Sequence, residues 1–247
     1  MRQFLLMILC ASTVSLFAQD AAYTMYESVI LEPDYENATA LMEAIAELNS
    51  TYQNEDPYKS LVWNISTGPN VGKLVWMMGP CTYSDLDNRP SGEHDKHWAE
   101  KVLVNLEGQS HGEYWRLNDE ISYEGNGEPN QVLRIRFLEL ARGQGYRLNG
   151  LLKKISEVVK AKDSGAQWNV YVNEFQQGYT IGRHIALVSG HTSWADFDEE
   201  DSMVEDYEKH HGEGSWQPFL NEWDDIIANS WDEIWTFDAN MSSSDDE

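Results

Sequence analysis

The chain has little cysteine. It contains two, Cys10 and Cys81, and Cys10 lies in a segment that we expect to be removed. No intramolecular disulfide is therefore expected, so packing must supply the stability. The Cys81 thiol is more simply interpreted as a small buried hydrophobe than as a nucleophile, because no obvious base adjoins it.

Positive charge is also scarce. The chain has 42 acidic residues against 17 lysines and arginines, a formal net charge of −25. Self-repulsion on this scale favours solubility and disfavours binding to nucleic acid, acidic polysaccharide or anionic membranes. We therefore expect neither a nucleic-acid nor a membrane partner.

The motifs of the common cofactor and nucleophile sites are missing. There is no P-loop, GxGxxG, serine elbow or paired-cysteine motif. The "HDKH" of His94 and His97 and the adjacent His210 and His211 admit a metal site, but solvated loops and surfaces explain such histidines more simply. The acidic run 196–208 lacks the ligand spacing of an EF-hand. No metal and no cofactor are expected.

A long apolar run occurs only at the start. It extends from Phe4 to Phe17, follows Arg2 and precedes the small residue Ala18. Gln19-Asp20 ends it before the roughly 20 residues that a membrane span needs. The pattern predicts a cleaved signal peptide over residues 1–18 and hence a secreted or periplasmic protein.

The remaining chain contains an internal sequence repeat. Trp63-Asn64-Ile65 is matched by Trp168-Asn169-Val170, and residues 25–33 are matched by 132–140. Further matches follow in the same order: Gly72-Lys73 with Gly182-Arg183, Asp85-Leu86-Asp87 with Asp196-Phe197-Asp198, His111-Gly112-Glu113 with His211-Gly212-Glu213, and Leu117-Asn118-Asp119 with Leu220-Asn221-Glu222. We interpret residues 19–127 and 128–241 as two repeats, followed by a disordered acidic tail over 242–247.

Each repeat is expected to fold in the order β-α-β-β-α-β. In the first, the expected elements are a strand over 24–32, a helix presenting Leu41, Ile45, Leu48 and Tyr52, a hairpin of 60–67 with 72–78, a helix from Trp98 through Val102 and a last strand over 121–124. In the second, they are a strand over 132–140, a helix presenting Leu148, Leu151, Ile155 and Val158, a hairpin of 167–175 with 181–189, a helix presenting Leu220, Trp223 and Ile227, and a last strand over 234–237.

This order is that of the ferredoxin-like split βαβ motif, whose helices cover one face of the sheet only. Two such sheets in one chain can bury their bare faces against each other. The predicted fold class is therefore α+β: two tandem ferredoxin-like units forming an intramolecular α/β barrel with helices outside. A ligand pocket is expected between the sheets, because imperfectly matched faces rarely fill the space.

The doubled unit, with "LVWNISTGP", "LVWMMGPCTYSDLDN" and "HIALVSGHTSWADFD", resembles the dimeric α/β-barrel superfamily, especially antibiotic biosynthesis monooxygenase-like and NIPSNAP-like domains. The resemblance covers nearly the whole mature chain. It implies a range of activities, since members include cofactor-free oxygenases, haem-degrading enzymes and isomerases. For the oxygenases, which use Asn, Trp and Arg, the nearest residue types are Asn64, Trp76 and Arg134. The haem-degrading members place a histidine on the second helix, and no corresponding pattern surrounds the histidines here.

Strand alternation sorts the side chains into two faces. Trp63 and Trp168 are expected in the core beneath the helices. The residues expected to face the pocket are Glu27, Asn64, Trp76, Arg134, Arg136, Asn169, Tyr171 and His184. In this set the arginines could hold an anion and His184 could move a proton. The alternative is an internal salt bridge of Glu27 with Arg134 or Arg136.

Three hypotheses about function follow. The first is an exported protein that binds a small apolar or aromatic ligand between its two sheets, as a monomer (a pseudo-dimer) or a homodimer. The second is a cofactor-free oxygenase or isomerase in which His184 and Arg134 are catalytic. The third is an interaction protein whose barrel is filled. A cavity smaller than a few hundred Å³ would favour the third.

Overall fold

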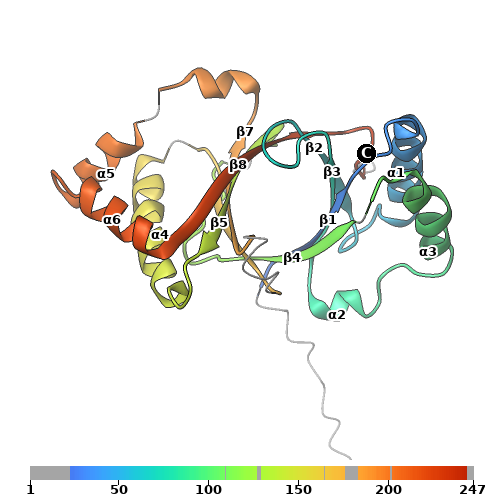
Figure 1. Cartoon of the computed structure of the whole chain (residues 1–247), viewed down its shortest axis with the longest axis horizontal. Helices are drawn as coiled ribbons and strands as arrows, with labels where there is room; N and C mark the ends of the chain where they lie inside the picture. The colour runs from blue at the N-terminus through green and yellow to red at the C-terminus, as the bar shows by residue number, and fades with distance from the viewer. Residues whose placement is uncertain are drawn as a thin grey trace, which may run out of the picture.

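The computed structural model describes residues 23–108, 110–126, 129–163, 165–175, 183–200 and 202–243. The expected signal peptide and most of the expected tail lie outside these ranges. A central barrel of strands separates two groups of helices, with α1 and α3 on one side and α4, α5 and α6 on the other (Figure 1).

The strands form one closed antiparallel barrel in the order β1-β3-β2-β8-β5-β7-β6-β4. Their bounds are β1 Met25–Leu31, β2 Ser60–Ile65, β3 Leu74–Cys81, β4 His111–Leu117, β5 Val132–Leu140, β6 Trp168–Asn173, β7 Ile185–His191 and β8 Ile227–Phe237. Each half of the chain contributes its four strands in the order last, first, third, second. The halves meet where β2 pairs with β8 and where β4 pairs with β6.

Helices follow the first and third strands of each half. Their bounds are α1 Ala38–Tyr52, α2 Tyr83–Leu86, α3 Glu93–His97 with a π-helical turn Trp98–Val102 and a 3-10 turn Leu103–Asn105, α4 Gly145–Lys162, a 3-10 turn Trp194–Asp198, α5 Met203–His211 and α6 Trp216–Ile226. None of the helices in the described part of the chain is long and apolar enough to cross a membrane.

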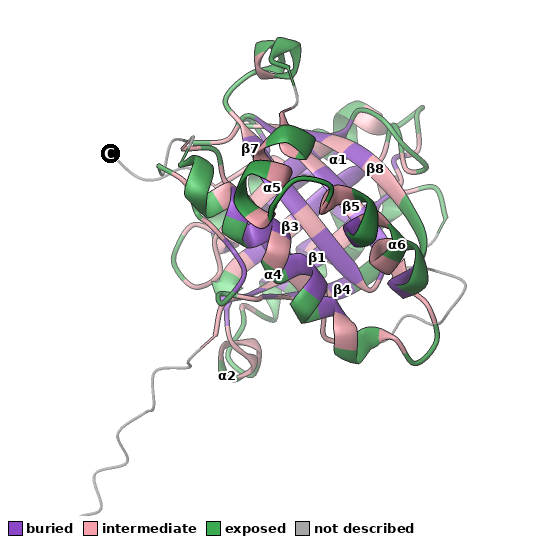
Figure 2. Cartoon of the chain, turned by 90° about the vertical axis from the view of Figure 1, so that its left-hand side faces the viewer, coloured by how far each residue is buried: buried purple, intermediate pink, exposed green. Residues whose placement is uncertain are grey.

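The core is divided into three clusters because successive strand residues point to opposite faces. Leu41, Ile45 and Leu48 of α1 pack with one strand face, and Leu151 and Ile155 of α4 pack with another. The buried strand segments beneath α4, α5 and α6 are visible in Figure 2. The third cluster includes residues of seven of the eight strands and forms the interior of the barrel.

Most expected elements are confirmed, including both hairpins and the apolar face of each first helix. The last strand of the first half is not. It was expected over 121–124, but β4 is His111–Leu117, while Ile121 is buried in a turn. The match of His111 with His211 is wrong for the same reason, because His211 ends α5 rather than lying in a strand.

Candidate functional site

A cavity of about 360 Å³ occupies one end of the barrel interior. All eight strands contribute to its wall. Its lining residues are Tyr26, Ser28, Leu61, Trp63, Met77, Trp115, Pro129, Asn130, Gln131, Leu133, Ile135, Phe137, Gln167, Tyr171, Ala186, Val188, Trp235 and Phe237. None of these is an acid, a base or a histidine, so the described wall is apolar and aromatic with a few neutral polar groups.

Aromatic rings contact one another around this cavity. Trp63 lies against Phe237 with ring centroids 5.2 Å apart, and Phe137 lies 5.9 Å from Trp115. Next to Trp115, on the strands β1 and β6 that flank β4, Tyr26 and Tyr171 meet edge to face at 6.0 Å. Such contacts fix the ring planes and leave broad apolar faces for a flat molecule.

Two polar atoms in the wall lack a partner. The Nε1 of Trp63 and the Oγ of Ser28 are buried and form no hydrogen bond with any described residue. Trp63 is 4 % exposed and Ser28 2 % exposed. A buried donor left without an acceptor costs roughly 1–3 kcal/mol. Both residues line the cavity, so an acceptor oxygen bound there could satisfy either donor after a small shift of its side chain.

The tyrosines of the wall are held neutral. Burial raises the pKa of Tyr171, and the neighbouring Tyr26 raises it further. Burial likewise raises the pKa of Tyr26, with a smaller contribution from Glu124. Both phenols thus keep their protons at ordinary pH and can donate hydrogen bonds but not act as bases.

The segment between the two halves forms one end of the cavity, which we call the linker end. Pro129 and Gln131 are exposed there, so the cavity reaches the surface. The Nδ2 of Asn130 donates to the Oε1 of Gln167. Gly190 lies directly beneath Asn130, and a Cβ at position 190 would overlap its amide group. Glycine is needed there for the linker to pack this close to β7.

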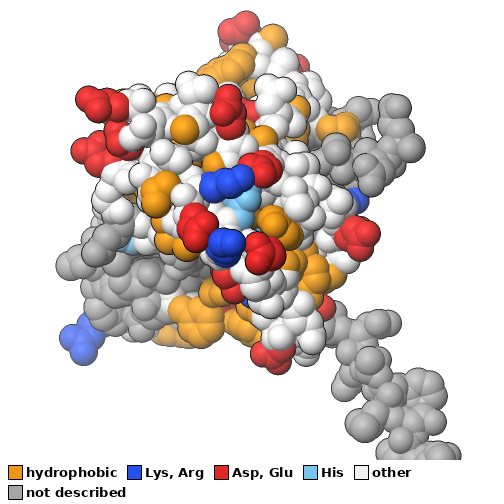
Figure 3. Space-filling view, turned by 90° about the vertical axis from the view of Figure 1, so that its right-hand side faces the viewer, with side chains coloured by type: hydrophobic (Ala, Val, Ile, Leu, Met, Phe, Trp, Pro, Cys, Tyr) orange, Lys and Arg blue, Asp and Glu red, His pale blue; other side chains and the backbone are white. Residues whose placement is uncertain are grey.

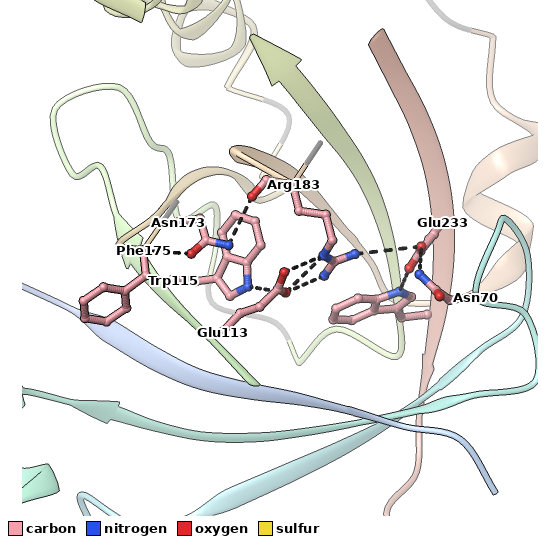
Figure 4. Close-up of polar contacts among 8 residues, drawn as sticks. Asn70, Glu113, Trp115, Asn173, Phe175, Arg183 and Glu233 are labelled. Atoms are coloured by element: carbon pink, nitrogen blue, oxygen red, sulfur yellow. Dashed lines mark hydrogen bonds and ion pairs between the residues drawn. The ribbon is translucent and has the colours of Figure 1, made fainter. Parts of the chain in front are cut away.

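The opposite end is closed by a buried ionic network, which we call the charged end (Figure 4). Arg183 donates to both carboxylate oxygens of Glu113 at 2.8 and 3.0 Å, and its NH1 lies 4.0 Å from Glu233. The guanidinium stacks over Phe137, with its Cζ 3.8 Å from the ring centroid. Asn70 donates to Glu233 at 2.8 Å.

Each carboxylate of this network also holds a tryptophan of the cavity. Trp115 Nε1 donates to Glu113 at 3.2 Å, and Trp235 Nε1 donates to Glu233 at 2.9 Å. The two Glu-x-Trp segments lie on β4 and β8, the last strand of each half. The sequence did not predict this pair, because Glu113 was aligned with Glu213. The signal was present in the segments EYW and EIW.

The predicted site residues of β6 and β7 have different outcomes. Tyr171 lines the cavity as expected. Asn169 is buried on the same strand face, but it is not among the lining residues. His184 does not reach the cavity either: its Nδ1 accepts a hydrogen bond from the backbone N–H of Leu140 at 3.0 Å. It borders a separate hollow of about 300 Å³ on the other side of β7.

The predicted positions in the other strands are wrong. Arg134 and Arg136 lie outside the barrel, where both donate to Asp232. Burial opposes the ionisation of Asp232, but the hydrogen bonds from Arg136 and Arg134 outweigh it and lower its pKa. The oxygenase hypothesis required His184 and Arg134 to converge on the cavity. They do not.

Glu27, Asn64 and Trp76 are also on the outer face. Glu27 pairs with Arg89 at 3.3 Å, not with Arg134 or Arg136. Asn64 donates to Asp238 at 3.0 Å, and Trp76 Nε1 donates to Asn49 beneath α1 at 2.9 Å. Trp63, expected beneath the helices, lines the cavity instead.

The reason is a register error of one residue. Trp168 packs with the helix-side cluster, whereas Trp63 points inward. The two Trp-Asn dipeptides are thus not equivalent in the structure. Because side chains alternate with period two, aligning them put Asn64 and Trp76 on the wrong face. The match of β1 with β5 keeps its register, and Glu27, Arg134 and Arg136 were misplaced because their shared face was taken as the inner one.

The histidines do not fit a haem in the cavity, since none of the chain's seven lines it. His94 contacts Gln53 at 3.0 Å, and His97 Nε2 donates to the backbone carbonyl oxygen of Ala44 at 2.9 Å, which fixes α3 on α1. On this face, shown in Figure 3, basic side chains lie among acidic ones. Cys81 is buried, and burial raises its pKa to about 11, which agrees with a packing role.

Comparisons with known proteins show similarity of fold alone. The sequence matches no family model and no curated protein. A protein provisionally named a monooxygenase from Lactobacillus acidophilus has a TM-score of 0.56 at 11% identity, covering 90% of this chain and 97% of that one. An anthrone oxidase-like protein gives 0.52 at 12% identity, covering 92% and 95%. Chlorite dismutase from Candidatus Nitrospira defluvii, in complex with imidazole, gives 0.55 at 8% identity, covering 89% and 93%. All are similar to this α+β barrel over nearly its whole length.

Proposed function

We propose that this protein binds a flat, apolar molecule that carries at least one hydrogen-bond acceptor oxygen. The observation that carries the proposal is the pair of unpartnered donors, Trp63 Nε1 and Ser28 Oγ, within a wall of aromatic rings. The aromatic faces would bury the ligand's surface, and the donors would fix the position of its oxygen.

The size of the cavity supports a small ligand. Pockets for small molecules generally measure about 300–1,000 Å³ and combine apolar walls with a few polar groups. The cavity here measures about 360 Å³, which is close to the lower limit. A molecule of two to three fused rings would fit, and a filled barrel is disfavoured.

Binding is favoured over catalysis because the described wall contains no acid, base or histidine. Among the described residues that line the cavity, the only titratable groups are Tyr26 and Tyr171, both held protonated by burial. A cofactor-free oxygenase remains the second candidate, because the similar structures include proteins named as a monooxygenase and as anthrone oxidase-like. In that case the cavity would position a substrate, and the tyrosines would donate hydrogen bonds to it.

The proposal extends to the architecture and the location of the protein. We attribute the repeated strand order to two tandem ferredoxin-like units, with the cavity in their shared interior. We also place the protein outside the cytoplasm, because residues 1–18 have the pattern of a cleaved signal peptide. Either a monomer or a homodimer is compatible with a barrel closed within one chain.

The test compares 9-fluorenone with fluorene, which has the same tricyclic skeleton without the carbonyl. Binding is measured by quenching of tryptophan fluorescence and by calorimetry. A hydrogen bond contributes about 1 kcal/mol, so the ketone should bind about five times more tightly. Trp63→Phe and Ser28→Ala should reduce this ratio, whereas Trp98→Phe, outside the barrel, should leave it unchanged.

Equal affinity for the two probes would refute the role of the donors, and no binding of either would refute the proposed function. Native mass spectrometry of protein purified from its own host provides an independent test, since a retained ligand would be detected directly. Oxygen consumption with tricyclic quinols as substrates would support the oxygenase instead.

A further inference from the structure

A cluster of potential metal ligands lies on the helices that cover the second half. Glu157 of α4 and His210 and His211 at the end of α5 each offer a ligand atom, and these atoms all lie within 4.8 Å of one another. Among the described residues this is the one group of three or more such side chains. None of the three lines the cavity.

The hydrogen bond of His211 defines which of its nitrogens is available. Its Nε2 lies 2.9 Å from the backbone carbonyl oxygen of Lys154. A carbonyl only accepts, so Nε2 must carry the proton and Nδ1 must present its lone pair. Metal-binding histidines typically donate their second ring nitrogen to a carbonyl or carboxylate in this way, because the bond fixes the tautomer and the ring plane.

Packing also orients the His211 ring. Tyr207, one turn earlier on α5, is buried and lies with its ring centroid 4.4 Å from that of His211. The His210 ring lies 4.7 Å from that of His211. Lys154 and Lys160 lie three residues before and after Glu157, and both are engaged elsewhere: Lys154 forms an ion pair with Glu222 at 2.5 Å, and Lys160 donates to the backbone oxygen of Glu120 at 3.1 Å. One ligand is thus held in place before any ion arrives.

We propose that Glu157, His210 and His211 bind one divalent transition-metal ion of the Zn²⁺, Ni²⁺ or Cu²⁺ class. Imidazole nitrogens together with a carboxylate oxygen select these ions over Ca²⁺ or Mg²⁺, which prefer oxygen ligands alone. Three protein ligands leave the remaining coordination positions to water. The ion would join α5 to α4 at the point where α5 ends.

This proposal departs from the expectation of no metal that the sequence raised. The adjacent histidines were visible in the sequence, but the third ligand belongs to another helix. Only the packing of α5 against α4 brings Glu157 to them.

The experiment uses the full-length mature protein without a histidine tag, after treatment with a chelator. Zn²⁺ and Ni²⁺ are titrated by calorimetry, and the thermal unfolding temperature is measured with and without the ion. We expect one equivalent to bind saturably and to raise the unfolding temperature, because a ligand that binds only the folded state stabilises it. Mg²⁺ at the same concentration should have no such effect.

His210→Asn and Glu157→Gln should each weaken binding by at least tenfold and abolish the shift in unfolding temperature. His111→Asn is the matched control, because His111 is exposed but lies on β4 outside the cluster. A long-range ¹H–¹⁵N spectrum gives a second readout: His211 should be protonated at Nε2 in the apoprotein, and its Nδ1 resonance should shift with Zn²⁺. Absence of a saturable equivalent, or equal binding by the His210→Asn and His111→Asn variants, would overturn the proposal.

Discussion

Two parts of the barrel interior treat buried polarity in different ways. At the charged end, Glu113 and Glu233 share the guanidinium of Arg183, and every described carboxylate there has donors. Along the cavity wall, Trp63 near the linker end and Ser28, which pairs with Glu113 across β1 and β4, keep donors without acceptors. The network leaves one donor, Arg183 NH1, without a hydrogen bond but satisfies its carboxylates, so it rigidifies its surroundings, whereas the donors of the wall have no partner at all.

The tryptophans show the same contrast. The indole N–H groups of Trp115 and Trp235 are bonded to the network, and that of Trp63 is not, although all three rings line one cavity. The charged end therefore fixes part of the wall, while the unpartnered donors supply its binding capacity.

Removing the cation of the charged end should have the largest effect. Arg183→Met leaves two buried carboxylates facing each other, and we expect the free energy of unfolding to fall by about 3–5 kcal/mol. Urea denaturation monitored by fluorescence measures this. Arg134→Met, which removes a half-exposed partner of Asp232, should cost only about 0–1 kcal/mol. Similar losses in the two variants would show that the network is not the rigid end of the barrel.

Filling the cavity should separate stability from binding. Ala186→Leu adds volume to the cavity wall, so it should change the free energy of unfolding by less than about 1 kcal/mol while weakening fluorenone binding by at least tenfold. The same substitution in a packed cluster, Ala44→Leu, should cost about 1–3 kcal/mol through overpacking. An equal cost at both positions would mean that no usable cavity exists at position 186.

Two tryptophan-to-phenylalanine variants test the comparison most directly. Trp235→Phe removes a hydrogen bond from the buried Glu233, and we expect a loss of about 1–3 kcal/mol. Trp63→Phe removes an N–H that had no partner and should cost less. Both variants lose the same atoms, so chemical denaturation compares them directly. A larger loss of unfolding free energy in Trp63→Phe than in Trp235→Phe would contradict the contrast between the bonded and the unpartnered indole.

The smallest expected effect concerns alkaline pH. The folded-state pKa of Tyr171 is raised by burial, so the unfolded chain loses this proton first. The stability that the protonated Tyr171 phenol contributes is fully present below the unfolded-state pKa of about 10, and it is lost as the pH rises above that value. Tyr171→Phe should reduce the loss of stability between about pH 10 and 11, as measured by urea denaturation at each pH. An unchanged slope would show that Tyr171 is not buried as described.

Much of the fold could be predicted from the sequence because its signals are local. The helix face of Leu148, Leu151 and Ile155 and the hairpin of 60–67 with 72–78 follow from spacing and turn chemistry alone. The last strand of the first half was missed. It carries the exposed His111 and the charged Glu113, so it lacks the apolar pattern expected of a strand.

The candidate site was predicted poorly because it depends on register. Tyr171 was placed correctly by strand alternation, but the assumed equivalence of Trp63 and Trp168 moved Asn64 and Trp76 to the wrong face. The inward arginine, Arg183, precedes β7 and was matched with Lys73, which binds Glu32 on the surface. No local pattern distinguishes these two environments; only long-range pairing does.

The last strand to be synthesised, β8, completes the ring between β2 and β5. Val132 and Thr236 are partners across this seam although a whole repeat separates them along the chain, and non-local pairings of this kind form slowly. Until β8 docks, two strand edges stay open to other chains and the interior has no wall on that side. A nascent or truncated chain that lacks residues 227–237 should therefore aggregate and depend on chaperones.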